Sequence, residues 1–408
     1  MNIRSITALI DVTYPLKAET IARAGNLLRA ACEALIEGGY AVQTRRLATH
    51  PFPAVLEEAG PGKALDLAKD LEALAFVHEI DYIGLGPVRL GDPPAFIGAI
   101  PDVFAGTDNV FASVEIASQA QGVSLPQLRR AAGAVQRTAA LSGDGFANLY
   151  LAALANVPPG APFFPAAYHR GGDLTFAIAT ESANLAVEAV TSATSLAGAR
   201  EALIHAVEVN AERIASIARR VAGRFDVAFG GIDFSLAPYP EEMRSVGRAL
   251  EQLGVPAFGG QGSLAAAAFL TDALDRADFK RAGFCGLMLP VLEDSILALR
   301  ARDGLLRLTD LLTFSAVCGT GLDTIPLPGD ITQQEIAAIL LDVAVLSLRL
   351  NKPLTARLMP LPGKQAGDEV TFDFDYFAPS RVLATQGGPL KGLLAGDEAI
   401  DIRSYTPR

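Results

Sequence analysis

The sequence predicts an α/β fold in which the strands pair mostly in parallel. Apolar runs of strand length alternate along the chain with Ala-rich segments of helical length, an order typical of parallel sheets with helical crossovers. Several apolar runs contain almost no polar residue, as expected for a sheet that is covered on both faces. The chain has 408 residues, and because α/β barrels of this length form single domains, we expect one domain over residues 1–408.

The predicted elements follow one another in a regular order. The predicted strands are apolar runs at residues 6–12, 82–85, 110–116, 174–179, 227–234, 284–292 and 354–360. The predicted helices are Ala-rich segments at residues 18–38, 65–80, 125–141, 199–222, 241–253, 264–274 and 332–350. Gly38 and Gly254 end two of these helices, and Thr332 with Glu335 predicts a capping box at the last. Residues 371–376 alternate polar and aromatic side chains, which indicates an edge strand or hairpin.

Composition argues against several classes of partner and location. The net charge is −11 and the pI about 5.0, without a cluster of Lys and Arg, so we expect neither nucleic acid nor a membrane surface as partner. The three cysteines are far apart, which disfavours a disulfide framework and fits a cytoplasmic protein. The most apolar helical segment, 336–350, is too short to span a bilayer. A mean hydropathy of +0.30 favours a homo-oligomer.

Cys318 is the first candidate for a catalytic residue. Gly319, Gly321 and Asp323 follow it closely. Glycines permit a sharp turn whose backbone amides point at a ligand, and such amides lower the pKa of a thiol. The segment therefore predicts a nucleophilic Cys318, with Gly319 and Gly321 binding the ligand. The alternative is that Cys318 is a small buried apolar residue on a tight turn.

His169 and Asp233 are the other two candidates for catalysis. His169 follows an apolar stretch and precedes Arg170, so it is the best general acid or base among the four histidines, and Arg170 is a candidate anion contact. Asp233 lies inside an apolar predicted strand, where a carboxylate must be paired, hydrogen-bonded or ligated. Its alternative role is to hold the following turn by accepting hydrogen bonds from backbone amides.

Three further acidic residues are candidates for ligand or metal binding. Glu115 interrupts an apolar strand, where it either contacts a ligand or forms a salt bridge. Glu293 and Asp294 directly follow another apolar run. They could hold a divalent cation, or they could stabilise the N-terminus of the next helix.

Glycine-rich motifs give little support for a nucleotide cofactor. No G-x-G-x-x-G motif follows the first predicted strand, and no G-x-x-x-x-G-K-[ST] motif occurs in the sequence, so neither NAD nor a P-loop nucleotide is expected. Gly260, Gly262 and Ser263 lead into a predicted helix, which makes them candidates for binding an anion. A plain tight turn is the alternative.

Six stretches of the chain together resemble a known family. They lie at residues 3–7, 112–116, 167–169, 231–238, 289–294 and 318–323. In this order they resemble domain-of-unknown-function family 711. The resemblance implies a ten-stranded α/β barrel like that of pyruvate formate-lyase-like glycyl radical enzymes, whereas periodicity alone leaves a TIM-like barrel as the alternative. Residues 401–408 contain no glycine of the kind that carries the radical, so we expect non-radical chemistry.

These observations predict an enzyme that acts on a small anionic metabolite in a barrel cavity. Cys318, His169 and Asp233 would line that cavity as nucleophile, acid or base, and orienting group. A second hypothesis is a non-catalytic ligand-binding or regulatory protein that uses the same cavity. A third is a metal-dependent hydrolase or lyase that uses Asp233, Glu115 and Glu293.

Overall fold

The computed structural model describes residues 1–405. Nearly all of its strands join into one large and mostly parallel sheet. This sheet, together with the helices around it, confirms the predicted α/β class. Its strands are β1 (Asn2–Ile10), β2 (Val42–Pro51), β3 (Tyr82–Gly86), β4 (Val110–Ser118), β5 (Gly122–Ser124), β6 (Leu151–Ala155), β7 (Thr175–Glu181), β8 (Ala228–Asp233), β9 (Gly321–Pro328), β10 (Leu354–Leu361) and β13 (Ala399–Ile400). The order is β8-β7-β1-β2-β3-β4-β6-β10-β9, with β5 paired to β4 and β13 paired to β5.

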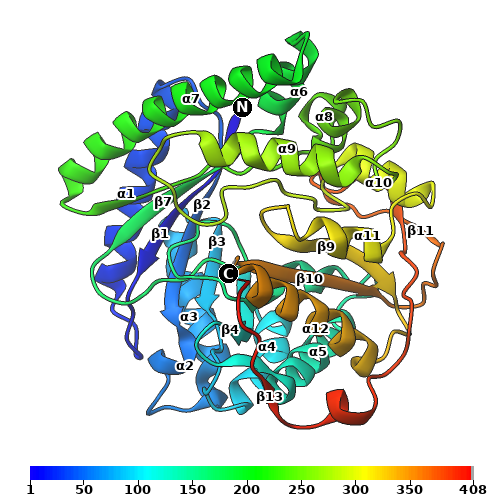
Figure 1. The fold of residues 1–408 in the computed structure, drawn as a ribbon. Coiled ribbons are helices and arrows are strands. Elements are labelled where there is room, and N and C mark those ends of the chain that lie inside the picture. Colours follow the sequence, from blue (N-terminus) through cyan, green and yellow to red (C-terminus); the bar gives the residue numbers. More distant parts are fainter. Residues whose placement is uncertain (406–408) are drawn as a thin grey trace.

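Helices lie around the outside of the strands, with α7 and α9 across the top in Figure 1 and α5 and α12 below. The helices are α1 (Ala18–Glu37), α2 (Phe52–Val55), α3 (Ala64–Val77), α4 (Ala95–Ala105), α5 (Leu125–Ala139), α6 (Ala183–Ser192), α7 (Leu196–Phe225), α8 (Val246–Gln252), α9 (Ser263–Arg276), α10 (Ser295–Arg302), α11 (Leu308–Phe314) and α12 (Gln333–Leu350). Across residues 1–405, no helix combines the length and the apolar character that crossing a membrane requires.

The strands of the sheet run in two directions. The β1–β7 and β6–β10 pairings are antiparallel, and the other neighbours in the main order pair in parallel. Residues 281–290 run beside both β8 and β9, the two strands at the ends of the main order. Arg281 bridges Ile232 of β8, and Pro290 bridges Asp323 of β9, both in parallel.

The predicted elements agree with the structure best where one face is uniformly apolar. Each predicted helix is present with shifted ends, and the capping box of Thr332 and Glu335 is formed. Sequence reasoning missed β2, β6 and β9. Residues 284–292 form isolated bridges instead of the predicted strand. Residues 371–376 lie in the loop of a short hairpin between β11 (Glu369–Val370) and β12 (Ser380–Arg381). The segment without a radical-site glycine, residues 401–408, is described only as far as residue 405. Residues 406–408 lie outside the part of the chain that the structure describes.

Side-chain alternation along the strands separates the apolar core from an inner, more polar face. On β10, Leu354, Ala356 and Leu358 pack into the main apolar cluster together with the helices, whereas Thr355 and Arg357 point to the opposite face. Because successive side chains of a strand point to opposite faces, the same backbone supplies both layers. The candidate functional site lies on the inner face.

Candidate functional site

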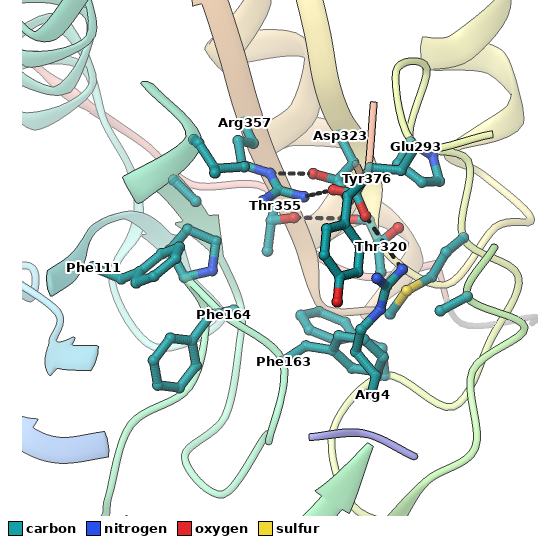
Figure 2. A pocket seen from close by; sticks show the side chains of 18 of the residues that line it. Arg4, Phe111, Phe163, Phe164, Glu293, Thr320, Asp323, Thr355, Arg357 and Tyr376 are labelled. Carbon is teal, nitrogen blue, oxygen red and sulfur yellow. Dashed lines mark hydrogen bonds and ion pairs between the residues drawn. The ribbon is translucent and has the colours of Figure 1, made fainter. Parts of the chain in front are cut away.

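A cavity lies on the inner face of the sheet, between the two groups of oppositely directed strands. The cavity is partly open to solvent, and its empty space, open solvent included, is about 920 Å³. Its charged and hydroxyl-bearing residues are Arg4, Thr44, Arg46, Glu293, Thr320, Asp323, Thr355 and Arg357. Its aromatic residues are Tyr82, Phe111, Phe163, Phe164, Phe284, Phe374 and Tyr376. Figure 2 shows many of these side chains pointing into a common space. The cavity therefore combines apolar walls with a group of charged residues.

Arg46 is a buried cation that has no acidic partner in the described part of the chain. Only 8% of its surface is exposed, and its Nε donates a hydrogen bond of 2.8 Å to Thr44 Oγ1. Its guanidinium lies 5.2 Å from the ring centre of Phe164 and 5.5 Å from that of Tyr82. Burial first, and then the charge of Arg4, lowers the pKa of Arg46 to about 10, so it stays cationic at neutral pH. No carboxylate among residues 1–405 forms an ion pair with it.

Arg4, in contrast, is held by acidic residues. It lies 3.4 Å from a carboxylate oxygen of Glu181 and 3.4 Å from one of Glu293, and its Nη2 donates a 2.6 Å hydrogen bond to the carbonyl of Pro238. Glu181 also pairs with Arg244 outside the cavity lining. Arg4 is therefore neutralised by its surroundings before any ligand binds.

Arg357 connects the two acidic residues of the cavity. Its Nε donates to Asp323 Oδ1 at 2.6 Å and its Nη2 to Glu293 Oε1 at 2.7 Å (Figure 2). The β9–β10 register shifts at this point, so that Asp323 and Thr324 both lie opposite Arg357, as in a β-bulge. Thr324 has a φ of 45°, which is a strained value for a β-branched residue. Burial raises the pKa of the Asp323 carboxyl, and Arg357 opposes that shift.

The lining therefore carries an excess of positive charge. Arg4, Arg46 and Arg357 contribute three guanidinium groups, and Glu293 and Asp323 contribute two carboxylates. Both carboxylates are already paired, because Glu293 pairs with Arg4 and Arg357 and Asp323 pairs with Arg357. The excess charge is that of Arg46, and a small anion would complete its pairing.

Two irregular segments supply most of the aromatic wall. The segment between β6 and β7 carries Phe163 and Phe164, and Thr7 Oγ1 anchors it through a 2.9 Å hydrogen bond to the Pro162 carbonyl. The hairpin loop between β11 and β12 contributes Tyr376, whose ring lies 5.1 Å from the Arg4 guanidinium. These aromatic side chains favour a ligand with an apolar body.

The Cys318 thiol does not line this cavity. Cys318 lies on the loop between α11 and β9, is 1% exposed and belongs to the main apolar cluster. Its Sγ accepts a 3.3 Å hydrogen bond from the Gly321 amide, and its carbonyl accepts one from Lys352. The same loop contributes Thr320 to the lining, and the start of β9 contributes Asp323. The segment from Cys318 to Asp323 thus contributes Thr320 and Asp323 to the cavity lining, whereas the Cys318 thiol is not part of it.

His169 lies in a different cluster, near the C-terminal ends of β1 and β2. Its amide donates to the Thr49 carbonyl at 2.9 Å, and its Nδ1 accepts from the Gly171 amide at 3.3 Å. Asp11 pairs with His50 at 2.5 Å. Burial lowers the pKa of His169, and Asp11 opposes that shift. His169 is absent from the cavity lining.

Asp233 holds the backbone of the neighbouring segment. It accepts hydrogen bonds from Ser235 Oγ at 2.6 Å, the Phe284 amide at 2.6 Å and the Cys285 amide at 2.9 Å. Burial raises its pKa to about 6, against these hydrogen bonds. This geometry agrees with the turn-holding role. The structure does not bring Cys318, His169 and Asp233 together on the cavity, and their catalytic roles stay predictions.

The remaining ligand candidates also lie away from the lining. Glu115 accepts a 2.9 Å hydrogen bond from the Leu90 amide, and burial raises its pKa. Ser263 Oγ accepts one from the Gly259 amide at 3.0 Å, which closes the glycine-rich turn of Gly260 and Gly262 at the start of α9. Arg170 is exposed. Gly319 and Gly321 flank Thr320 and shape the loop without lining the cavity.

Glu293 and Asp294 have separate roles although they are adjacent. Glu293 faces the cavity and pairs with Arg4 and Arg357. Asp294 is buried and accepts hydrogen bonds from the first turns of both α8 and α10, which fits the predicted helix role. In the described part of the chain, no cluster of three or more His, Cys, Asp or Glu side chains is arranged to hold a metal ion.

Sequence reasoning missed the three arginines of the cavity. Arg46 and Arg357 each lie two residues after a threonine, Thr44 and Thr355, within an otherwise strand-like run. Such spacing places both side chains on one face of a strand. A polar pair repeated on two strands is the signal that would have pointed to a polar inner face.

Comparisons with known proteins place this chain in a family. The family described as "Uncharacterised ACR (DUF711)" matches residues 1–376. A UPF0210 protein of Pyrobaculum arsenaticum is 36% identical over 81% of this chain and 76% of its own length. A UPF0210 protein of Methanopyrus kandleri is 32% identical over 100% of this chain and 92% of its own. One from Desulforudis audaxviator is 32% identical over 86% and 80%. The chain therefore belongs to the DUF711 family.

Proposed function

We propose that the protein is a non-radical enzyme that binds a small organic anion in the cavity, with Arg46 as the counter-ion of the anionic group. The observation that carries this proposal is a buried guanidinium that faces the cavity and has no acidic partner among the described residues. A buried charge without a partner is costly, and a carboxylate matches the planar geometry of a guanidinium with two parallel hydrogen bonds. The aromatic wall suits an apolar body on the same ligand.

Asp323 is the proposed acid–base group of the reaction. Burial raises its pKa, and perturbed carboxylates in cavities are candidates for proton transfer. Support also comes from the strained backbone at Thr324, directly beside it, because strain is concentrated at functional sites. In the proposed step the Asp323 carboxylate accepts a proton from the carbon next to the ligand carboxylate, becomes the neutral acid and returns a proton to that carbon.

A second candidate function is binding without catalysis. The observation that favours it is that Arg357 pairs with both Asp323 and Glu293. A carboxylate paired with a guanidinium favours its ionised form and is therefore a weaker base for removing a proton from the ligand. The cavity would then recognise an anion without changing it.

The binding proposal is tested with Arg46→Met and a matched control on the same strand. Arg45 is adjacent, and its side chain pairs with Glu79 and Asp81 instead of lining the cavity. The probes are benzoate, 3-phenylpropionate and 4-methylpentanoate, measured by calorimetry. We expect Arg46→Met to weaken binding by about tenfold or more, since a hydrogen bond to a charged group contributes about 1.5–3 kcal/mol. Arg45→Met should bind as the unmodified protein does. Equal affinities of Arg46→Met and the unmodified protein would contradict the proposal.

Catalysis is separated from binding by proton exchange. Bound 3-phenylpropionate or 4-methylpentanoate in D₂O should exchange the protons of the CH₂ group next to its carboxylate, as followed by NMR, and Asp323→Asn should remove that exchange. Binding without any exchange would support the second candidate.

We further propose that the sheet closes into the ten-stranded barrel that the family resemblance implies. Support comes from residues 281–290, which bridge β8 on one side and β9 on the other. With this segment counted as a strand, five neighbouring strands would run in each direction. A single domain over residues 1–408 would follow, because both halves of the chain would share one ring of strands.

A further inference from the structure

Thr320 lines the cavity and carries a buried hydroxyl. The residue is 4% exposed and lines the cavity. Its Oγ1 finds no hydrogen-bond partner in the part of the chain that the structure describes. A buried hydroxyl normally has a partner, and leaving one without a partner costs free energy. Thr320 therefore points to a ligand atom that would complete its hydrogen bonding.

The backbone around Thr320 is held firmly in place. Gly319 and Gly286 are in such close contact that a Cβ on Gly319 would lie 2.7 Å from the Gly286 Cα. The Gly319 amide also donates a 2.6 Å hydrogen bond to the Leu287 carbonyl. On the other side, Gly321 has a φ of 98°, which favours glycine. The hydroxyl is thus fixed between two glycine positions that cannot easily shift.

Thr355 adds a second hydroxyl to the lining, beside the Thr320 backbone. Its Oγ1 donates a 3.0 Å hydrogen bond to the Thr320 carbonyl, and its amide donates to that carbonyl at 2.7 Å (Figure 2). Because the proton of the Thr355 hydroxyl is used, its oxygen can only accept a further hydrogen bond. A ligand hydroxyl can accept from Thr320 and donate to Thr355, whereas a carbonyl can only accept.

We infer that the ligand is a hydroxycarboxylic acid, whose carboxylate is bound by Arg46 and whose hydroxyl is bound by Thr320 and Thr355. This inference rests on the proposed function and names the substrate class of the same site. A second anionic group is disfavoured there, because Glu293 and Asp323 already occupy the other two guanidinium groups. The neutral hydroxyls of the two threonines match a neutral polar group instead.

The test uses pairs of probes that differ by one hydroxyl. They are phenyllactate with 3-phenylpropionate, and 2-hydroxyisocaproate with 4-methylpentanoate, with affinities measured by calorimetry. The variants are Thr320→Val, which replaces the hydroxyl by a methyl group of similar shape, and Arg46→Met. Thr138→Val is the matched control, because Thr138 is buried in α5 with an equally unpartnered hydroxyl and does not line the cavity.

We expect the unmodified protein and Thr138→Val to bind the hydroxy acid of a pair about tenfold more tightly than its deoxy partner, as one hydrogen bond allows. Thr320→Val should lose that preference and still bind both acids. A protein without the preference, or Thr320→Val with the preference intact, overturns the inference while the anion proposal stands. Failure of every probe to bind, or binding that is unaffected in Arg46→Met, overturns the proposed function and the inference with it.

Discussion

Asp323 and Arg357 face each other across a bulge in the β9–β10 pairing, with 2.6 Å between Asp323 Oδ1 and Arg357 Nε. The bulge places two residues of β9 opposite one residue of β10, and this turns the Asp323 side chain toward the inner face. Glu293 reaches the same guanidinium from a loop. A local irregularity in one strand pair thus creates the charged end of the cavity.

Breaking this pair should destabilise the protein strongly. Arg357→Met leaves the largely buried Asp323 carboxylate without its partner and leaves Glu293 paired with Arg4 alone, and we expect the free energy of unfolding to fall by about 3 kcal/mol in urea titrations. The double variant Arg357→Met with Asp323→Asn should recover part of that loss, since one unpaired charge is removed. A double variant as unstable as the sum of its single changes would show that the two residues act independently.

The stability of the protein should depend on pH through Asp233. Its folded-state pKa of about 6 lies above the ordinary value of 3.8, so the folded state keeps a proton that the unfolded state has lost. The contribution of this group is present below pH 3.8 and is lost as the pH rises through about 6, by about 3 kcal/mol at full extent. Because asparagine does not titrate, the stability of the unmodified protein relative to Asp233→Asn should fall between pH 4 and pH 6.5. Denaturant midpoints that change with pH in parallel for both proteins would argue against a contribution of Asp233 to the pH dependence of stability.

Cys318 should behave as a core residue under chemical labelling. Because it is buried in the apolar cluster, iodoacetamide should modify the partly exposed Cys32 well before Cys318 in the folded protein, as read by mass spectrometry. Cys318→Ser should lower the free energy of unfolding by about 1–3 kcal/mol through burial of a hydroxyl, with unchanged affinity for carboxylic acids. Rapid alkylation of Cys318, together with a stable serine variant, would instead support the nucleophile predicted from the sequence.

Substitutions at the adjacent acids Glu293 and Asp294 should affect different properties, anion affinity at Glu293 and stability at Asp294. Asp294→Ala removes the acceptor for four backbone amides of α8 and α10, so we expect a loss of about 3 kcal/mol or more in the free energy of unfolding. Glu293→Gln keeps a hydrogen-bond acceptor at Arg357 and should mainly change the affinity for anions. Thermal unfolding and calorimetry on the two variants distinguish these effects, and a larger destabilisation from Glu293→Gln would contradict them.

The sequence predicted the α/β class and most helices, because one apolar face repeats along each of these segments. It missed β2, whose first half is a run of polar residues from Gln43 to Arg46 and therefore lacks an apolar strand pattern. An arginine that points into a cavity has the same local pattern as one that points to solvent. Cys318 shows a related limit, since its glycines indicated a turn correctly and gave no information on which neighbour faces the cavity.

The cavity is lined by residues that lie far apart in the sequence. Arg4 lies in β1, whereas Arg357 lies in β10 and Tyr376 in the loop between β11 and β12. Residues 1–350 therefore contain only part of the pocket, and the complete set of contacts forms only when residues 351–376 pack against β1. A metabolite that binds the finished pocket would stabilise the native state alone, holding together segments that are distant along the chain.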